Sequence, residues 1–156
     1  MKKIFFAGMA LALFQADQAV KREIEELSEG GGEYPLSGGF ADIERLHNYG
    51  LAGSRWVGHM TEIVQGTALV TACDVGMFIR LLTMPGQLVR TVGAAFLTGG
   101  ALSNLYDRCR RGYVVDYIRF HTPFKCLNRL VFNLADFFIF IGTVLICAGN
   151  GGHSQS

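Results

Sequence analysis

Four apolar segments divide the chain, and stretches rich in polar residues and glycine separate them. The segments cover about 4–20, 59–82, 88–106 and 130–148, with the turn Met84-Pro85-Gly86 between the second and the third. A helix needs about 20 mainly apolar residues to cross the hydrocarbon core of a bilayer. The pattern therefore predicts an α-helical integral membrane protein with four transmembrane helices. The second helix is the least apolar, because it carries Glu62, Gln65 and Asp74.

The two longer polar segments differ in character. Residues 21–57 combine an acidic run with clustered glycines, and they predict a small β-rich cradle with short strands near 34–40 and 43–49. Residues 107–129 form a second polar loop, whose amphipathic stretch 112–120 is expected to lie along the membrane surface. The full length, 1–156, is expected to form one membrane domain.

Composition supports this view. Half of the residues are hydrophobic and 17% are charged, against about 25% charged residues in ordinary soluble domains. A net charge of +1 argues against nucleic acid as a partner. Met-Lys-Lys followed by Ile4 to Phe14 resembles the start of a signal peptide. The apolar run before the small residues Ala10 and Ala12 is too short for a cleavable one, so we expect a retained first helix.

Orientation follows from the order of the segments. In a four-span serpentine the first and third helices run in the same direction, so 21–57 and 107–129 share one face of the membrane. Lys2 and Lys3 place both termini in the cytoplasm. The outer face then holds six basic residues, against the positive-inside rule, and carboxylates or lipid phosphates are the expected partners: Arg108, Arg110, Arg111, Arg119, Lys125 and Arg129. Cys109 and Cys126 share the second outer loop, where a disulfide and free thiols are both compatible with the sequence.

Two carboxylates occupy positions where a charge is costly. Asp107 closes the third apolar segment and Asp136 lies inside the fourth, and an ionisable group there is by default a candidate for function. Asn104 precedes Asp107 by one helical turn, and Asn133 precedes Asp136 in the same way. Two nearby carboxyl groups share one proton, so that one can activate water while the other polarises a carbonyl. We therefore expect Asp107 and Asp136 to approach within about 3–6 Å of each other. Pairing of Asp107 with a neighbouring arginine is the structural alternative.

The same residues carry a resemblance to the lipoprotein signal peptidase (signal peptidase II) family. Three blocks carry it, in order: Gly99-Gly-Ala-Leu-Ser-Asn-Leu-Tyr-Asp-Arg108, Arg111-Gly-Tyr-Val-Val-Asp116 and Phe132-Asn-Leu-Ala-Asp136. Asp17-Gln-Ala-Val-Lys21 and His47-Asn-Tyr-Gly-Leu-Ala52 resemble further elements of the family. The resemblance covers about 4–148. Ser103 departs from it, since the family usually has glycine there.

The resemblance implies an aspartic endopeptidase of the bacterial inner membrane, with its active site toward the outer face. It would cut diacylglyceryl-modified prolipoproteins before the lipidated cysteine, as a monomer among membrane lipids and without metal or cofactor. Asp107 and Asp136 would be catalytic. Substrate binding or support of the site would come from Asn104, Arg108, Asn133, Asn48, Asp17 and Lys21.

Two other functions are compatible with the sequence. A catalytically silent relative would bind lipidated peptides without turnover, although a decayed site has little reason to keep both Asn-x-x-Asp pairs. A small ion or solute transporter subunit would use membrane carboxylates such as Asp74 and Asp136 as ligands. The greater predicted depth of Asp74 speaks against matched ligands on facing helices. Asp74 itself has no assigned role.

Overall fold

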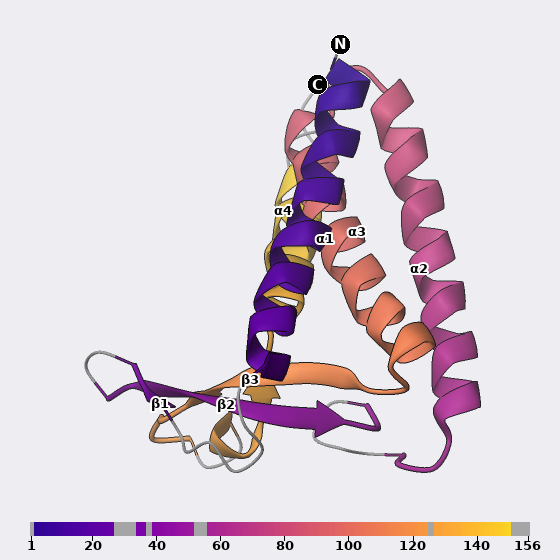
Figure 1. Cartoon of the computed structure of the whole chain (residues 1–156). Helices are drawn as coiled ribbons and strands as arrows, with labels where there is room; N and C mark the ends of the chain where they lie inside the picture. Colours follow the sequence, from indigo (N-terminus) through magenta and orange to yellow (C-terminus); the bar gives the residue numbers. More distant parts are fainter. Residues whose placement is uncertain (1, 27–33, 37–38, 52–55, 125–126, 151–156) are drawn as a thin grey trace.

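Four helices stand over a small antiparallel sheet in the computed structural model, which describes residues 2–26, 34–36, 39–51, 56–124 and 127–150 (Figure 1). The helices are α1 (Lys2–Glu26), α2 (Met60–Thr83), α3 (Leu88–Arg110) and α4 (Leu134–Asn150). The strands are β1 (Tyr34–Pro35), β2 (Ala41–Asn48), β3 (Val114–Phe120) and β4 (Val131–Phe132), with a short 3-10 helix, Leu127–Arg129, before β4. The sheet closes one end of the helices, and both chain ends lie at the other.

The sheet is built from both polar segments rather than from the first alone. Its order is β1-β2-β3-β4, with every neighbouring pair antiparallel. The stretch expected to lie along the membrane surface is instead strand β3, which pairs with β2 on one side and β4 on the other. Val114, Val115 and Tyr117 in β3 are buried, and β-branched and aromatic residues of this kind favour a pleated, packed strand.

Helix α1 continues six residues beyond the predicted end of the first apolar segment and ends at Glu26. Asp17 and Lys21 therefore lie inside a helix, one turn apart, and both are fully buried. The third helix likewise continues past Asp107 to Arg110. These extensions carry polar side chains from two helices down to the level of the sheet.

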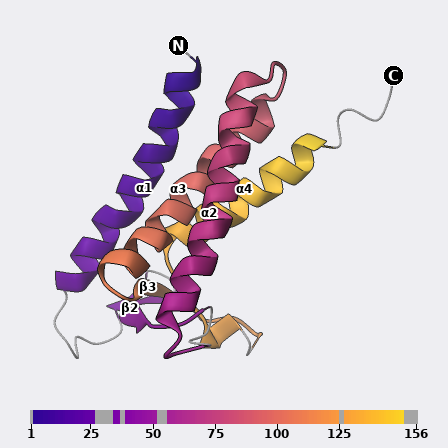
Figure 2. The same ribbon diagram turned by 90° about the vertical axis from the view of Figure 1, so that its right-hand side faces the viewer.

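Helix α3 is the centre of the bundle and packs against each of the other three helices (Figure 2). Glycines allow the close approach. A Cβ atom on Gly100 would lie 2.5 Å from the carbonyl oxygen of Ala135 in α4, and one on Gly99 would lie 2.8 Å from that of Ala10 in α1. Small residues thus allow close contact on two faces of α3.

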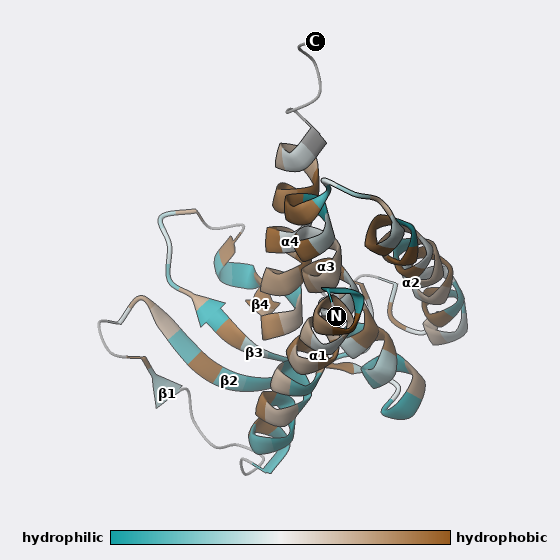
Figure 3. Cartoon of the chain, turned by 90° about the horizontal axis from the view of Figure 1, so that it is seen from above, coloured by the Kyte–Doolittle hydropathy of each residue, from teal (hydrophilic) through white to brown (hydrophobic). Residues whose placement is uncertain are grey.

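The outward faces of the helices are apolar. Large hydrophobic side chains are exposed on α1, α2, α3 and α4, among them Phe5, Leu69, Val89 and Phe140, and extensive exposed apolar surface marks contact with a membrane or a partner. Figure 3 shows these apolar helices beside the more polar sheet. Among the described residues only Met60–Thr83 is long and apolar enough to qualify as a span by composition, and Leu134–Gly149 is a shorter apolar helix.

Candidate active site

Asp107 lies in a closed cluster of ion pairs where α1 meets α3. The ammonium nitrogen of Lys21 is 2.8 Å from Asp107 Oδ2 and 2.7 Å from Asp17 Oδ2, and all three side chains are fully buried. The same nitrogen donates a hydrogen bond to Asn104 Oδ1 at 2.9 Å. A buried charge is tolerated only when it is paired and hydrogen-bonded, and this cluster meets that condition.

Three further groups donate to the oxygens of Asp107. They are the side-chain amide of Gln18 at 2.9 Å, the guanidinium of Arg111 and the backbone N–H of Val115 at 3.4 Å. Both oxygens are thus engaged, and Asp107 does not line a cavity with Asp136. Asp107 pairs with Arg111, as the structural alternative expected.

Asp116, in the middle of β3, is a carboxylate that shares a cavity with Asp136. The cavity measures about 430 Å³ and lies between the sheet, α3 and α4. Asn48 Nδ2 donates to Asp116 Oδ2 at 3.0 Å, and Asn133 Nδ2 donates to Oδ1 at 2.7 Å. Burial raises the pKa of Asp116 to about 6; the amide of Asn48 opposes the rise and the charge of Asp136 adds to it.

Asp136 is fixed by the start of helix α4. Its backbone N–H donates to Asn133 Oδ1, and the backbone N–H of Asn133 donates to Asp136 Oδ2, both at 3.1 Å. This reciprocal arrangement is a capping box, formed here by Asn and Asp. Asn104 Nδ2 donates to the other oxygen of Asp136 at 3.1 Å. The Asn-x-x-Asp spacing therefore both begins the helix and orients the carboxylate.

Two asparagines connect the cavity with the buried ion pairs. Asn104 accepts from Lys21 and donates to Asp136, while Asn133 donates to Asp116 and caps α4. Arg108 lines the same cavity and donates to the backbone oxygen of Asn104 at 3.3 Å. Six of the predicted site residues either line this cavity or form hydrogen bonds with residues that line it. They are Asp136, Asn104, Arg108, Asn133, Asn48 and Lys21.

Asp17 links α1 to the start of α4 and to α3. Its Oδ1 accepts from the backbone N–H of Ala135 at 3.1 Å, which satisfies one of the free donors in the first turn of α4. Its Oδ2 accepts from the hydroxyl of Ser103 at 2.6 Å, and that hydroxyl also accepts from Gln18. The serine that departs from the usual glycine is thus part of the polar link between α1 and α3.

A second cavity, of about 510 Å³, opens on the other side of Asp136, between α2 and α3. It shares Asn104, Arg108, Asp136 and Ile139 with the first cavity and extends past Asp74. The two hollows therefore meet at Asp136. No group of three His, Cys, Asp or Glu side chains is placed as metal ligands within the described part of the chain.

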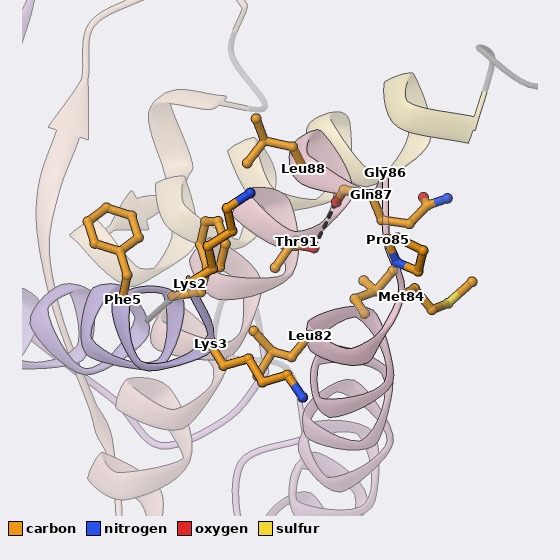
Figure 4. A pocket seen from close by; sticks show the side chains of 12 residues that line it. Lys2, Lys3, Phe5, Leu82, Met84, Pro85, Gly86, Gln87, Leu88 and Thr91 are labelled. Atoms are coloured by element: carbon orange, nitrogen blue, oxygen red, sulfur yellow. Dashed lines mark hydrogen bonds between the residues drawn. The ribbon is translucent and has the colours of Figure 1, made fainter.

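A larger cavity lies at the opposite end, near the start of α1. It measures about 600 Å³ and lies between the start of α1 and the connection from α2 to α3 (Figure 4). Its walls are mostly apolar, with Lys2 and Lys3 at the edge and a hydrogen bond from the Thr91 hydroxyl to the backbone oxygen of Gln87. None of the described residues that line it is a carboxylate.

Asp116 closes one of the quoted blocks but is not among the site residues that the sequence predicts. The available signal was a carboxylate between buried Val115 and Tyr117 in a strand-forming stretch. A charge in such a position is as unusual as one in an apolar helix. The prediction of a surface segment for 112–120 does not account for this carboxylate, which lies in a central strand of the sheet.

Solved structures show which class of fold this is. A bacterial membrane enzyme determined by the in meso method at 2.3 Å resolution is similar with a TM-score of 0.79 at 24% identity, over 97% of this chain and 92% of its own. A second such structure, at 1.9 Å resolution, gives a TM-score of 0.76 at 24% identity, over 96% and 94%. This chain therefore has the same fold as these two bacterial membrane enzymes.

The family follows from the sequence comparisons. The family model described as signal peptidase (SPase) II matches residues 9–149. Lipoprotein signal peptidase of Brucella ovis is 37% identical over 132 residues, covering 83% of this chain and 79% of the relative. That of Mesorhizobium japonicum is 38% identical over 108 residues, covering 69% of this chain and 62% of the relative. The chain belongs to the signal peptidase II family, as the motifs predicted.

Proposed function

We propose that this protein is an intramembrane aspartic endopeptidase that removes signal peptides from diacylglyceryl-modified prolipoproteins, cutting before the lipidated cysteine. One observation carries the proposal: Asp116 and Asp136 line one cavity, each held by asparagine side chains. In this proposal the catalytic pair is Asp116 and Asp136, and not Asp107 and Asp136 as the sequence motifs suggested. Family membership and the names of the relatives support lipoprotein signal peptidase function.

The pair supplies the chemistry of peptide hydrolysis. Two carboxyl groups that line one cavity share a proton, and their titration belongs to the pair. The ionised member takes a proton from water as its oxygen attacks the scissile carbonyl, while the protonated member donates to the carbonyl oxygen. Collapse of the tetrahedral intermediate breaks the C–N bond, and the leaving nitrogen takes a proton from the pair. The products are a carboxylate and the free amine of the lipidated cysteine.

The surroundings suit a lipidated peptide at a membrane surface. Apolar side chains of Phe132, Ile139 and Phe140 line the cavity beside the carboxylates, and Arg108 supplies a positive charge. The sheet end would face the outer side of the inner membrane, with all four helices spanning and both termini in the cytoplasm. The partners are then prolipoproteins and membrane lipids, and the protein acts as a monomer without a metal or cofactor.

The decisive test is cleavage of a diacylglyceryl-modified prolipoprotein by purified variants. Asp116→Asn and Asp136→Asn should each lower turnover at least about a thousandfold, because an amide can neither take nor give the shared proton. Asp42→Asn is the matched control, since Asp42 is a buried carboxylate of the neighbouring strand β2, paired with His121 and outside the cavity. Near-parental turnover by either dyad variant would rule out the mechanism. No turnover by the parent would favour a silent relative.

A further inference from the structure

The cavity between the start of α1 and the connection from α2 to α3 has no part in the proposed mechanism (Figure 4). Its volume of about 600 Å³ falls in the range of sites that bind small ligands, about 300–1,000 Å³. Phe6 and Leu81 form buried parts of its wall. Phe5 and Leu88 also line it and are 67% and 65% exposed. The cavity is therefore apolar and open to the outside of the helix bundle.

Four cations lie at this end of the bundle. Lys2 and Lys3 line the cavity from the first turn of α1, and both are exposed (Figure 4). Arg80 lies in the last turn of α2, and Arg90 lies near the start of α3. The sequence contains no Asp or Glu in the three stretches that carry the helices to this end: 2–16, 75–106 and 137–156. The chain itself therefore supplies no acidic side chain here to balance the positive charge.

The cations and the apolar wall lie in the order that a phospholipid requires. Phe6 follows Lys2 by one turn of α1, which is a rise of about 6 Å at about 1.5 Å per residue. A phosphate at the lysines would thus have its acyl chains beside the wall, on the side of the membrane interior. Anionic lipids of the cytoplasmic leaflet attract lysine and arginine side chains near the membrane surface.

Other occupants match only one of these two features. A free phosphate ion would pair with the lysines but would gain nothing from the apolar wall. A second copy of this chain would bring its own four cations to the same level of the membrane, and like charges repel each other there. The charge and the wall together therefore favour a lipid with a negative headgroup.

We propose that this cavity binds one anionic phospholipid of the cytoplasmic leaflet. Its phosphate pairs with Lys2 and Lys3, and its acyl chains pack against Phe5, Phe6 and Leu88. The proposal depends on an orientation with the sheet end outside, and it is independent of the peptidase activity. The bound lipid joins the start of α1 to the connection from α2 to α3.

Native mass spectrometry of the purified protein in detergent tests the proposal. The probes are dioleoyl phosphatidylglycerol, which is anionic, and dioleoyl phosphatidylcholine, which has the same chains and no net charge. The parent should bind the first phosphatidylglycerol about thirtyfold more tightly, since each lysine contributes about fivefold. Lys2→Gln combined with Lys3→Gln should bind the two lipids alike, and Lys2→Arg with Lys3→Arg should keep the preference. Equal binding of the two lipids by the parent would overturn the proposal.

The matched control removes two cations from the opposite end. Arg22 and Arg110 are exposed residues at the sheet end and lie outside the cavity, so Arg22→Gln with Arg110→Gln should keep the parental lipid preference. All four replaced side chains are exposed, and the unfolding temperature without lipid should therefore match the parent in both double variants. An equal loss of preference in both would assign the effect to net charge and refute a site at Lys2 and Lys3.

Variants of the wall separate a lipid from a simple anion. Phe5→Ala with Leu88→Ala removes apolar surface but no charge, and it should weaken binding of phosphatidylglycerol about tenfold. Leu69→Ala is the control, because Leu69 is 68% exposed on α2 and lies outside the cavity. Unchanged binding by the wall variant would rule out acyl-chain contact. Displacement of the lipid by inorganic phosphate at equal concentration would identify an anion site and also contradict the proposal.

Discussion

Lys21 is the residue on which the buried polar cluster depends. Its ammonium group lies between Asp17 and Asp107 and also donates to Asn104, with no exposure to solvent. Together with Arg111 it balances the two negative charges. The cluster ties α1 to α3 and, through Asp17, to the first turn of α4. The cluster therefore fixes the helices that carry the site, although its own charged residues do not line the cavity.

Removal of this cation should be strongly destabilising. Lys21→Met leaves Asp17 buried without its cation, and breaking a buried pair in this way typically costs about 3–5 kcal/mol. Thermal unfolding in detergent should show a large loss of stability. Arg22→Met is the matched control, because Arg22 is the next residue of α1 and is exposed. Equal stability of the two variants would show that the cluster does not hold the fold together.

Asp116 should make stability depend on pH in a defined direction. Burial raises its pKa from 3.8 to about 6, so the folded protein holds a proton that the unfolded chain has already released. The resulting stabilisation is fully present below 3.8 and is lost as pH rises through about 6. Relative to Asp116→Asn, the parent should lose thermal stability between those two values. Parallel pH profiles for parent and variant would contradict the shifted pKa.

At the scale of elements, the contact between α3 and α4 sets the geometry of the site. Gly100 faces Ala135, the residue immediately before Asp136, and Gly142 faces Gly93 and Leu97. Both contacts are too close for a side chain. Glycines in apolar helices favour close packing, but the sequence does not indicate which glycine meets which helix.

A methyl group at this contact should move Asp136. Gly100→Ala places its Cβ 2.5 Å from the oxygen of Ala135, and overpacking of this kind costs about 1–3 kcal/mol. Cleavage should fall about a hundredfold, because a displacement of about 1 Å at a reacting group has that effect. Gly76→Ala is the control, since nothing lies within 4 Å of a Cβ there. Equal cleavage by both variants would show that helix spacing does not control the site.

At the scale of the whole molecule, two of the six basic residues expected on the outer face pair with carboxylates. Arg111 pairs with Asp107, and Arg119 pairs with Glu44 in β2, 2.6 Å apart. Arg108 lies in the cavity beside Asp116 and Asp136. The apparent conflict with the positive-inside rule is therefore smaller than the count of basic residues suggested, because paired cations present little free charge.

Native cysteines can test the orientation. Cys109 is exposed near the sheet end of α3, Cys147 is exposed near the opposite end, and Cys73 is exposed in the middle of α2; all three are free thiols. Cys126 lies outside the described residues. In variants that keep a single cysteine, a membrane-impermeant thiol reagent should label Cys109 from outside intact cells and Cys147 only after lysis. Cys73 should stay unlabelled in the bilayer. The reverse pattern would invert the topology.

The sequence by itself determined the four helices, the presence of a small sheet and the family. Apolar runs of helical length and the blocks around Asn104, Asp116 and Asn133 suffice for these conclusions. Spacing along one helix also placed Asn133 one turn before Asp136, where it caps the helix. Local periodicity settles such relations because they depend only on neighbouring residues.

Only the tertiary structure decided which carboxylates line the same cavity. Asp107 and Asp116 are nine residues apart, and both follow an apolar stretch. The extended α1 brings Lys21 to Asp107, whereas the sheet places Asp116 over the start of α4, where Asn133 reaches it. Both contacts join segments distant in the chain, and no pattern within a single helix or strand specifies them. The pairing in space therefore makes Asp107 a buried counter-ion and leaves Asp116 facing the cavity with Asp136.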